Sequence, residues 1–216
     1  MNDDTNSSYY GYPMGNYVMV PLGKVNPDWT MGITNTVSYK GFRIMALVEI
    51  KRGGLMWNGT LGAAEFHGTS GDTQTRNDAF SWKGVLGHLG TDPDGNEIVV
   101  VTNDKPSPIN APLDEHWYRL GEGSSFTGPT ISSIQKTDWT RLREVTASYT
   151  FPKNLLAKAF ISSLEIYFTG RNLFLNTPYT GIDPETNLLG SSNAQGFDYF
   201  NMPGTKSYSF GLRVSF

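Results

Sequence analysis

The final segment of the chain alternates between apolar and small or polar residues without a break over five consecutive pairs. Successive side chains of a β-strand point to opposite faces, so this pattern predicts a strand with one apolar face. The apolar positions are Tyr208, Phe210, Leu212, Val214 and Phe216. The opposite positions are Ser207, Ser209, Gly211, Arg213 and Ser215.

Four other segments alternate in the same way, less cleanly. Together with the terminal one they predict strands near 30–39, 42–52, 138–151, 161–172 and 205–216. The first and third connections are short, whereas 53–136 and 173–204 are long. Outer-membrane barrels have short periplasmic turns and long extracellular loops. The sequence therefore predicts an all-β fold made of the antiparallel strands of a transmembrane β-barrel.

Aromatic residues collect at the ends of the strands that meet the short turns. Such residues form a girdle at the membrane interface, where a ring lies partly in lipid and partly in water. Strand parity also brings Phe216 to this edge. The predicted periplasmic girdle consists of Tyr39, Phe42, Tyr149, Phe151 and Phe160.

Composition excludes several classes of protein. The 216 residues carry a net charge of −3, which does not indicate a nucleic-acid partner. The chain has no cysteine, so it can form no disulfide and has no thiolate chemistry. No apolar run approaches the roughly 20 residues of a membrane-spanning helix. The start, Met1 to Asp4, lacks the features of a signal peptide, so on the barrel interpretation we expect the true N-terminus to lie upstream.

Several short motifs follow one another in a characteristic order. They are Asn26 to Thr30, Tyr39 to Phe42, Arg52 to Gly54, Asn58 to Thr60, Leu142 to Val145, Ser148 to Pro152, Gly170 to Phe174, Tyr179 to Glu185 and Met202-Pro203. In this order and with these gaps, residues 15–216 resemble the C-terminal barrel region of the SusC/RagA family of TonB-dependent outer-membrane transporters.

The resemblance implies a barrel of about 22 strands that is filled by an N-terminal plug. It also implies a SusD-like surface lipoprotein as a lid, the TonB complex acting through the plug, and uptake of an oligosaccharide or peptide in the outer membrane of Bacteroidota. Five strands cannot close a barrel in lipid, because an open edge leaves backbone groups unpaired. The chain is thus expected to work with the plug and the remainder of the barrel.

Three groups of residues are candidates for function within this frame. In outer-membrane proteins the barrel-assembly machinery recognises an apolar alternation that ends in Phe, which the positions from Tyr208 to Phe216 match. Glu165, Arg171 and Arg213 are expected to face the lumen and pack on the plug. Trp82, Trp117 and Tyr118, in the long loop, are possible contacts with substrate or lid, although packing within the loop is the simpler expectation.

Polar motifs give little sign of catalysis or metal binding. Asp183 and Glu185 flank Pro184 and predict a turn. The run Asp92 to Asn96 lacks the distal Glu of a calcium loop, so a turn is again expected. His67, His88 and His116 are dispersed. We therefore predict no enzyme activity, no cofactor and no metal site. Arg141 and Arg143 share parity with Val145, which predicts that they project outward near lipopolysaccharide or into solvent.

Two other classes of protein would explain some of these sequence features. A soluble, secreted all-β glycan-binding module explains the aromatic residues and the turns, but it predicts neither the aromatic edge nor the alternation of short and long connections. A β-rich glycosidase would need a pair of carboxylates, for which the sequence gives no convincing candidate.

Overall fold

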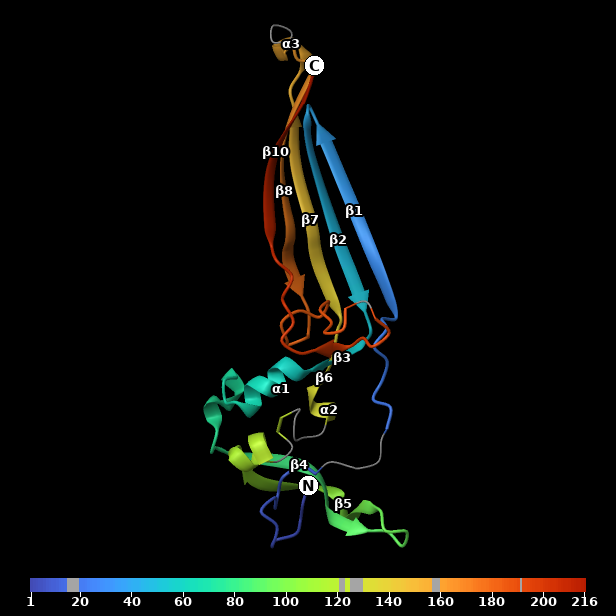
Figure 1. Ribbon diagram of the computed structural model, residues 1–216, viewed down its shortest axis with the longest axis vertical. Helices are drawn as coiled ribbons and strands as arrows, with labels where there is room; N and C mark the ends of the chain where they lie inside the picture. The colour runs from blue at the N-terminus through green and yellow to red at the C-terminus, as the bar shows by residue number, and fades with distance from the viewer. Residues whose placement is uncertain (15–19, 121–122, 125–129, 157–159, 191) are drawn as a thin grey trace. The chain divides into compact units, whose positions relative to one another are not determined.

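A computed structural model describes residues 1–14, 20–120, 123–124, 130–156, 160–190 and 192–216 (Figure 1). The chain divides into two compact units. The sheet unit comprises Lys24–Leu55, Lys136–Thr186 and Met202–Phe216, and the loop unit comprises Met1–Gly23, Met56–Gln135 and Asn187–Asn201. Each unit is described by itself below.

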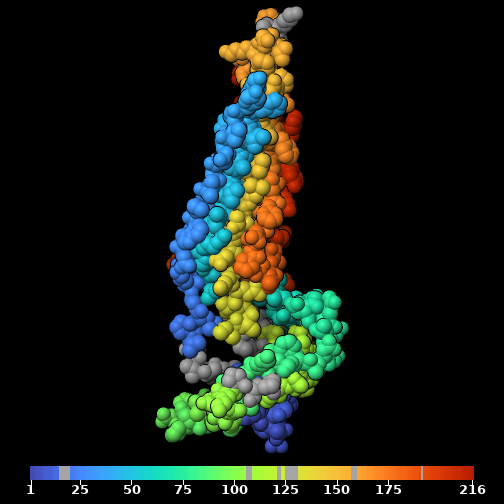
Figure 2. All heavy atoms as spheres, turned by 180° about the vertical axis from the view of Figure 1, so that it is seen from behind, coloured from blue at the N-terminus to red at the C-terminus, as the bar shows by residue number. Residues whose placement is uncertain are grey.

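The sheet unit is a five-stranded antiparallel sheet in the order β1-β2-β7-β8-β10. Its strands are β1 (Trp29–Tyr39), β2 (Phe42–Arg52), β7 (Trp139–Thr150), β8 (Ser163–Asn176) and β10 (Ser207–Ser215). A two-residue turn with positive φ at Lys40 and Gly41 joins β1 to β2, and a connection containing the short helix α3 (Lys153–Leu156) joins β7 to β8. Figure 2 shows the strands side by side as space-filling atoms.

One face of this sheet is apolar from edge to edge. The register places Val37 beside Ile44, Ile44 beside Ala147, Ala147 beside Phe168 and Phe168 beside Phe210, which forms a continuous row across all five strands. Most side chains on this face are exposed; Phe210, for example, is 74% exposed and Tyr208 65%. The sheet therefore presents a wide apolar surface that no described part of the sheet unit covers.

The loop unit contains two small sheets and several short helices. A hairpin pairs β4 (Ala79–Thr91) with β5 (Glu97–Pro112). A second sheet has the order β6-β3-β9, from Ile134–Lys136, Leu55–Asn58 and Phe197–Asp198. The helices are α1 (Gly59–Phe66), η1 (Gly71–Thr75), η2 (His116–Leu120) and α2 (Thr130–Ser133). Segment 53–136, expected to be a long loop, thus has regular structure of its own.

Helix α1 begins where the sequence provides a cap. The side-chain oxygen of Asn58 accepts a hydrogen bond from the backbone N–H of Leu61, which satisfies one of the free donors of the first turn. None of the described helices has both the length and the apolar character that would be needed to cross a membrane.

An aromatic ring covers a glycine on the polar face of the sheet. Gly211 of β10 pairs with Tyr167 of β8, and a Cβ on Gly211 would lie 2.2 Å from the Tyr167 ring. A larger residue at position 211 must displace this ring. Overpacking of this kind typically costs about 1–3 kcal/mol.

We predict that Gly211→Val lowers the free energy of unfolding by about 1–3 kcal/mol, measured by urea unfolding of the purified protein. The loss should shrink in a Tyr167→Ala background, because the clashing ring is then absent. Ser209→Val, on the same strand and face, is the matched control. An equal loss in both backgrounds would contradict the proposed contact.

Candidate functional site

The polar face of the sheet is crossed by ion pairs between neighbouring strands. Arg213 of β10 contacts Glu165 of β8 at 2.5 Å, and Arg171 of β8 contacts Glu144 of β7 at 2.8 Å. The Arg213 guanidinium also lies over the Tyr167 ring, 5.8 Å from its centroid. These contacts place Glu165, Arg171 and Arg213 on the face opposite the apolar row.

A cavity of about 320 Å³ lies on this polar face. Its lining includes Arg43, Met45, Glu144, Thr146, Glu165 and Arg213. The hydroxyls of Thr146 and Thr169 are 2.9 Å apart within it. The face offers both donors and acceptors, so it suits a hydrated lumen or a polar protein segment.

A partly buried cluster of two arginines and three carboxylates lies in the sheet unit. Arg141 donates to Asp183 at 2.7 Å, and both side chains are nearly inaccessible, at 4% and 7% exposure. The Arg141 Nε lies 2.9 Å from Glu185, close enough for an ion pair although the orientation is not that of a hydrogen bond. Arg143 bonds both Glu49 of β2 and Glu185.

This cluster holds the connection between β8 and β10. Asp183 and Glu185 belong to that connection, whereas Arg141 and Arg143 belong to β7. Arg143 also donates to Asn172, whose side chain donates to the carbonyl of Thr205 near the start of β10. Both ends of the connection are therefore tied to the polar face.

The prediction that Arg141 and Arg143 project outward with Val145 is wrong. A β-bulge lies at this point: Leu47 pairs with Glu144, but Val48 pairs with Leu142, so Arg143 is an extra residue in β7. The extra residue reverses the parity of the strand beyond it. Leu142 joins the apolar face, and Arg141, opposite Glu49, turns to the polar face.

The Asp183-Pro184-Glu185 segment does form the expected turn, since Asp183 accepts the backbone N–H of Glu185 at 3.0 Å. Its ion pairs with β7 were not predicted. The signal available in the sequence was two acids in one connection and two arginines in one strand. Without the bulge, however, strand parity places those arginines on the wrong face.

The predicted girdle residues lie together at the turn end of the sheet. Tyr39 pairs with Phe42, and Phe42 pairs with Tyr149, with ring centroids 4.5 Å apart. The ring centroids of Tyr149 and Phe151 are 5.0 Å apart. Phe160 is 92% exposed and Phe216 is 91% exposed. Their position in a membrane interface stays a prediction, as does the assembly role of Tyr208 to Phe216.

In the loop unit, the aromatic residues that were candidate contacts pack mainly on one another. The rings of Trp82 and Trp117 are 4.4 Å apart, and Tyr12 stacks on Trp117 at 6.0 Å. Tyr118 is buried, and its hydroxyl donates to the carbonyl of Asp72. Trp117 and Tyr118 nevertheless line cavities, so a contact with substrate or lid stays a proposal.

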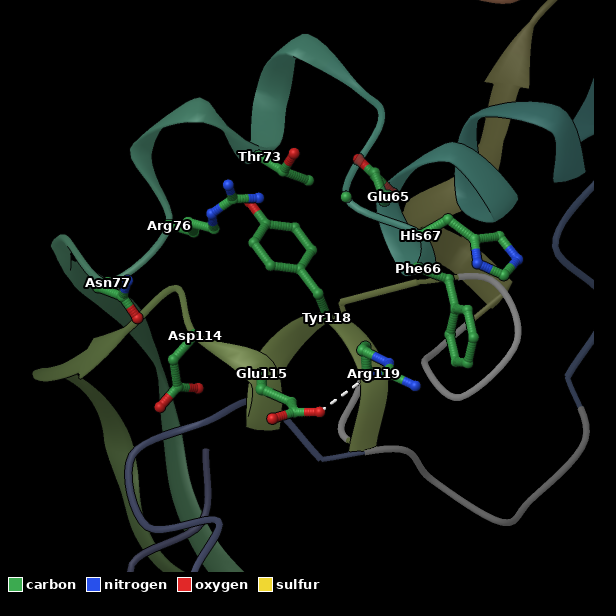
Figure 3. A pocket seen from close by; sticks show the side chains of 11 residues that line it. Glu65, Phe66, His67, Thr73, Arg76, Asn77, Asp114, Glu115, Tyr118 and Arg119 are labelled. Carbon is green, nitrogen blue, oxygen red and sulfur yellow. Dashed lines mark hydrogen bonds and ion pairs between the residues drawn. The ribbon is translucent and has the colours of Figure 1, made fainter.

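A pocket of about 480 Å³ opens beside Tyr118. Figure 3 shows Tyr118 reaching from η2 toward Thr73 and Arg76, with the Glu115–Arg119 pair at the rim. Burial, with a smaller contribution from Asp72, raises the pKa of Glu65 in this pocket to about 7. Glu65 can thus exist as a neutral acid near physiological pH.

Metal coordination finds no support in the part of the chain that the structure describes, where no group of three or more His, Cys, Asp or Glu side chains could hold an ion. Asp92 accepts the backbone N–H groups of Asp94 and Asn96, as a turn requires. His88 lies 3.4 Å from Asp3, and His116 lies 3.9 Å from Asp114.

Sequence comparison relates the chain to receptors from Formosa agariphila. It is 25% identical over 200 residues to TonB-dependent receptor P3, covering 90% of this chain and 17% of the relative. It is 30% identical over 123 residues to TonB-dependent receptor P39, covering 51% of this chain and 12% of the relative. No protein-family model matches the chain.

Structural comparison points the same way. The chain superposes on the RagAB peptide importer in the closed-closed state with a TM-score of 0.56, at 21% identity, over 91% of this chain and 18% of that one. The open-open state gives a TM-score of 0.54. The predicted antiparallel barrel fold is therefore confirmed, although the strands described here do not close a barrel. This chain spans less than a fifth of the length of these relatives.

We predict that Arg141→Met lowers the free energy of unfolding by about 3–5 kcal/mol, because it leaves the buried Asp183 carboxylate without its partner. Asp183→Leu in the same protein should recover most of the loss, since both charges are then gone. Urea unfolding of the two single variants and the double variant measures the coupling. Arg119→Met, at an exposed pair, is the control and should cost less than about 1 kcal/mol. Additive losses at Arg141 and Asp183 would contradict the buried pair.

Glu65 should make the stability of the protein depend on pH. Its folded-state pKa is raised above 4.5, so its contribution favours folding below pH 4.5 and is lost as the pH rises through about 7. Glu65→Gln removes this loss, and its advantage over the wild type should grow between pH 5 and pH 8. Thermal unfolding across that range measures the effect, and parallel pH profiles for the two proteins would exclude it.

Proposed function

We propose that this segment of a SusC/RagA-type TonB-dependent receptor is part of the barrel wall of an outer-membrane nutrient importer. The assignment to the TonB-dependent receptors made from the sequence motifs is confirmed by the receptors to which the chain is similar, and the RagAB structures share its fold. The import function of the whole protein is the proposal, since the chain covers only part of those relatives.

The proposal rests on the difference between the two faces of the sheet, since one presents apolar side chains and the other presents charged and polar ones. The apolar row from Val37 to Phe210 is exposed, whereas the opposite face holds the Glu165–Arg213 and Glu144–Arg171 pairs. A soluble protein rarely exposes so wide an apolar surface. A barrel wall in lipid requires it, with the polar face turned to the lumen.

The same arrangement supports specific partners. The edges of β1 and β10 have free backbone groups that the remainder of the barrel would pair, and the polar face would pack on the plug. We propose a SusD-like lipoprotein over the outer mouth, the TonB complex acting through the plug, and the barrel-assembly machinery engaging β10. The cargo would be an oligosaccharide or a peptide, and the chain would carry no enzyme activity and need no cofactor.

The alternative is a soluble, secreted glycan-binding module. The aromatic residues of the loop unit fit it, because flat rings stack on sugars. The bare apolar face of the sheet does not fit it, since such a module must keep this face away from water. Fractionation distinguishes the two, as the module stays in solution without detergent and the receptor does not.

A charge on the apolar face tests the membrane role directly. We predict that Leu212→Lys lowers the stability of the receptor in a bilayer by about 2–4 kcal/mol and reduces its amount in the outer membrane. Ser209→Lys, on the opposite face of the same strand, should be tolerated. Outer-membrane fractionation and folding titration in lipid vesicles measure both variants. Equal tolerance of the two lysines would contradict a lipid-facing surface.

A further inference from the structure

A second cavity of the loop unit contains a buried amide donor that has no partner. The cavity has a volume of about 170 Å³ and shares Glu65 and Tyr118 with the pocket of Figure 3. Asn58 lines it and is completely buried, yet its Nδ2 meets no hydrogen-bond acceptor in the described structure. Buried amide groups nearly always have a partner, so this donor indicates a missing acceptor.

The cap of helix α1 fixes the direction of this donor. Because the Asn58 oxygen accepts the Leu61 N–H at 3.1 Å, the amide cannot be turned around without losing the cap. Ser, Thr or Asp would cap the helix as well. Among the good capping side chains, only Asn adds an N–H group. The residue type at position 58 therefore provides a donor that the helix itself does not need.

One face of α1 forms a wall of the cavity. Asn58, Leu61, Gly62 and Glu65 all line it and are spaced as one helical face. Seven residues correspond to roughly 10 Å along a helix. The helical wall of the cavity thus runs from an amide donor at one end to a carboxyl group at the other.

An aromatic ring is held in place against this wall. The N–H of Gly123 donates to the carbonyl of Trp117 at 2.8 Å, and a Cβ on Gly123 would lie 2.5 Å from the indole Nε1. Trp82 packs on the same ring. The glycine is thus needed for the position of Trp117, whose ring lines the cavity.

We propose that this cavity binds an amide carbonyl of the transported solute, whose oxygen accepts the free Asn58 N–H while the rest of the ligand extends along α1 toward Glu65. A neutral carbonyl fits better than a carboxylate because none of the described residues that line the cavity is basic. One water molecule is too small to fill it. This inference rests on the proposed import function, and the amide could belong to a peptide backbone or to an N-acetylated sugar.

The test uses the full-length receptor in detergent and isothermal titration calorimetry. N-acetylglucosamine and glucose differ at one substituent, and N-acetylglycinamide represents the peptide backbone. We expect the amide probes to bind and glucose to bind at least about tenfold more weakly. Binding of N-acetylglucosamine alone would indicate a glycan source, and binding of N-acetylglycinamide alone would indicate a peptide source.

Asn58→Asp is the decisive variant, since it keeps the capping oxygen and removes the donor. Its buried carboxylate should lower the thermal stability, so binding is measured below the unfolding transition of each protein, where the folded variant should lose at least about tenfold in affinity for the amide probes. Asn96→Asp adds the same charge elsewhere in the loop unit and should bind normally. The proposal is overturned if no probe binds the folded receptor, if glucose binds equally well, or if Asn58→Asp binds like the wild type. A receptor that fails here but still imports its solute leaves the proposed function intact.

Discussion

The pairing of backbone groups between antiparallel strands is the constraint on which the rest of the sheet unit depends. Once the ladder fixes the register, alternate side chains are sent to opposite faces. In this chain that register aligns an apolar residue of every strand in one row, from Val37 to Phe210. This alignment gives the sheet one apolar face, which suits lipid, and one polar face, which suits water or a polar protein segment.

The bulge at Arg143 changes the parity of β7 where the long connection between β8 and β10 contacts this strand. One extra residue in β7 turns Arg141 to the polar face, where Asp183 and Glu185 neutralise the buried charge. The same cluster includes Glu49 of β2. The strand irregularity, the ion pairs and the position of the connection thus depend on the same residues.

Much of the sheet could be predicted from alternation alone. For the terminal strand, a range of 205–216 was expected and Ser207–Ser215 is observed; the predicted end of β8 differs more, at residue 172 instead of Asn176. The bulge could not be predicted, because nothing in a period-two pattern indicates where an extra residue is inserted. The β4–β5 hairpin was largely missed, since Gly84, Gly87 and Gly90 interrupt the alternation of β4. The unpaired amide of Asn58 depends on burial, which only the folded chain determines.

The proposed position of the apolar row against lipid can be measured directly. The segment has no cysteine, so single cysteines at Leu212 and Ser209 can carry spin labels in a receptor reconstituted into a bilayer, provided that the remainder of the receptor is also free of reactive cysteine. If the apolar row faces lipid, a label at position 212 is accessible to oxygen dissolved in the lipid and protected from a water-soluble nickel reagent. A label at position 209, on the opposite face, is protected from the oxygen dissolved in the lipid. A label at 212 that is accessible to the water-soluble reagent would contradict the account.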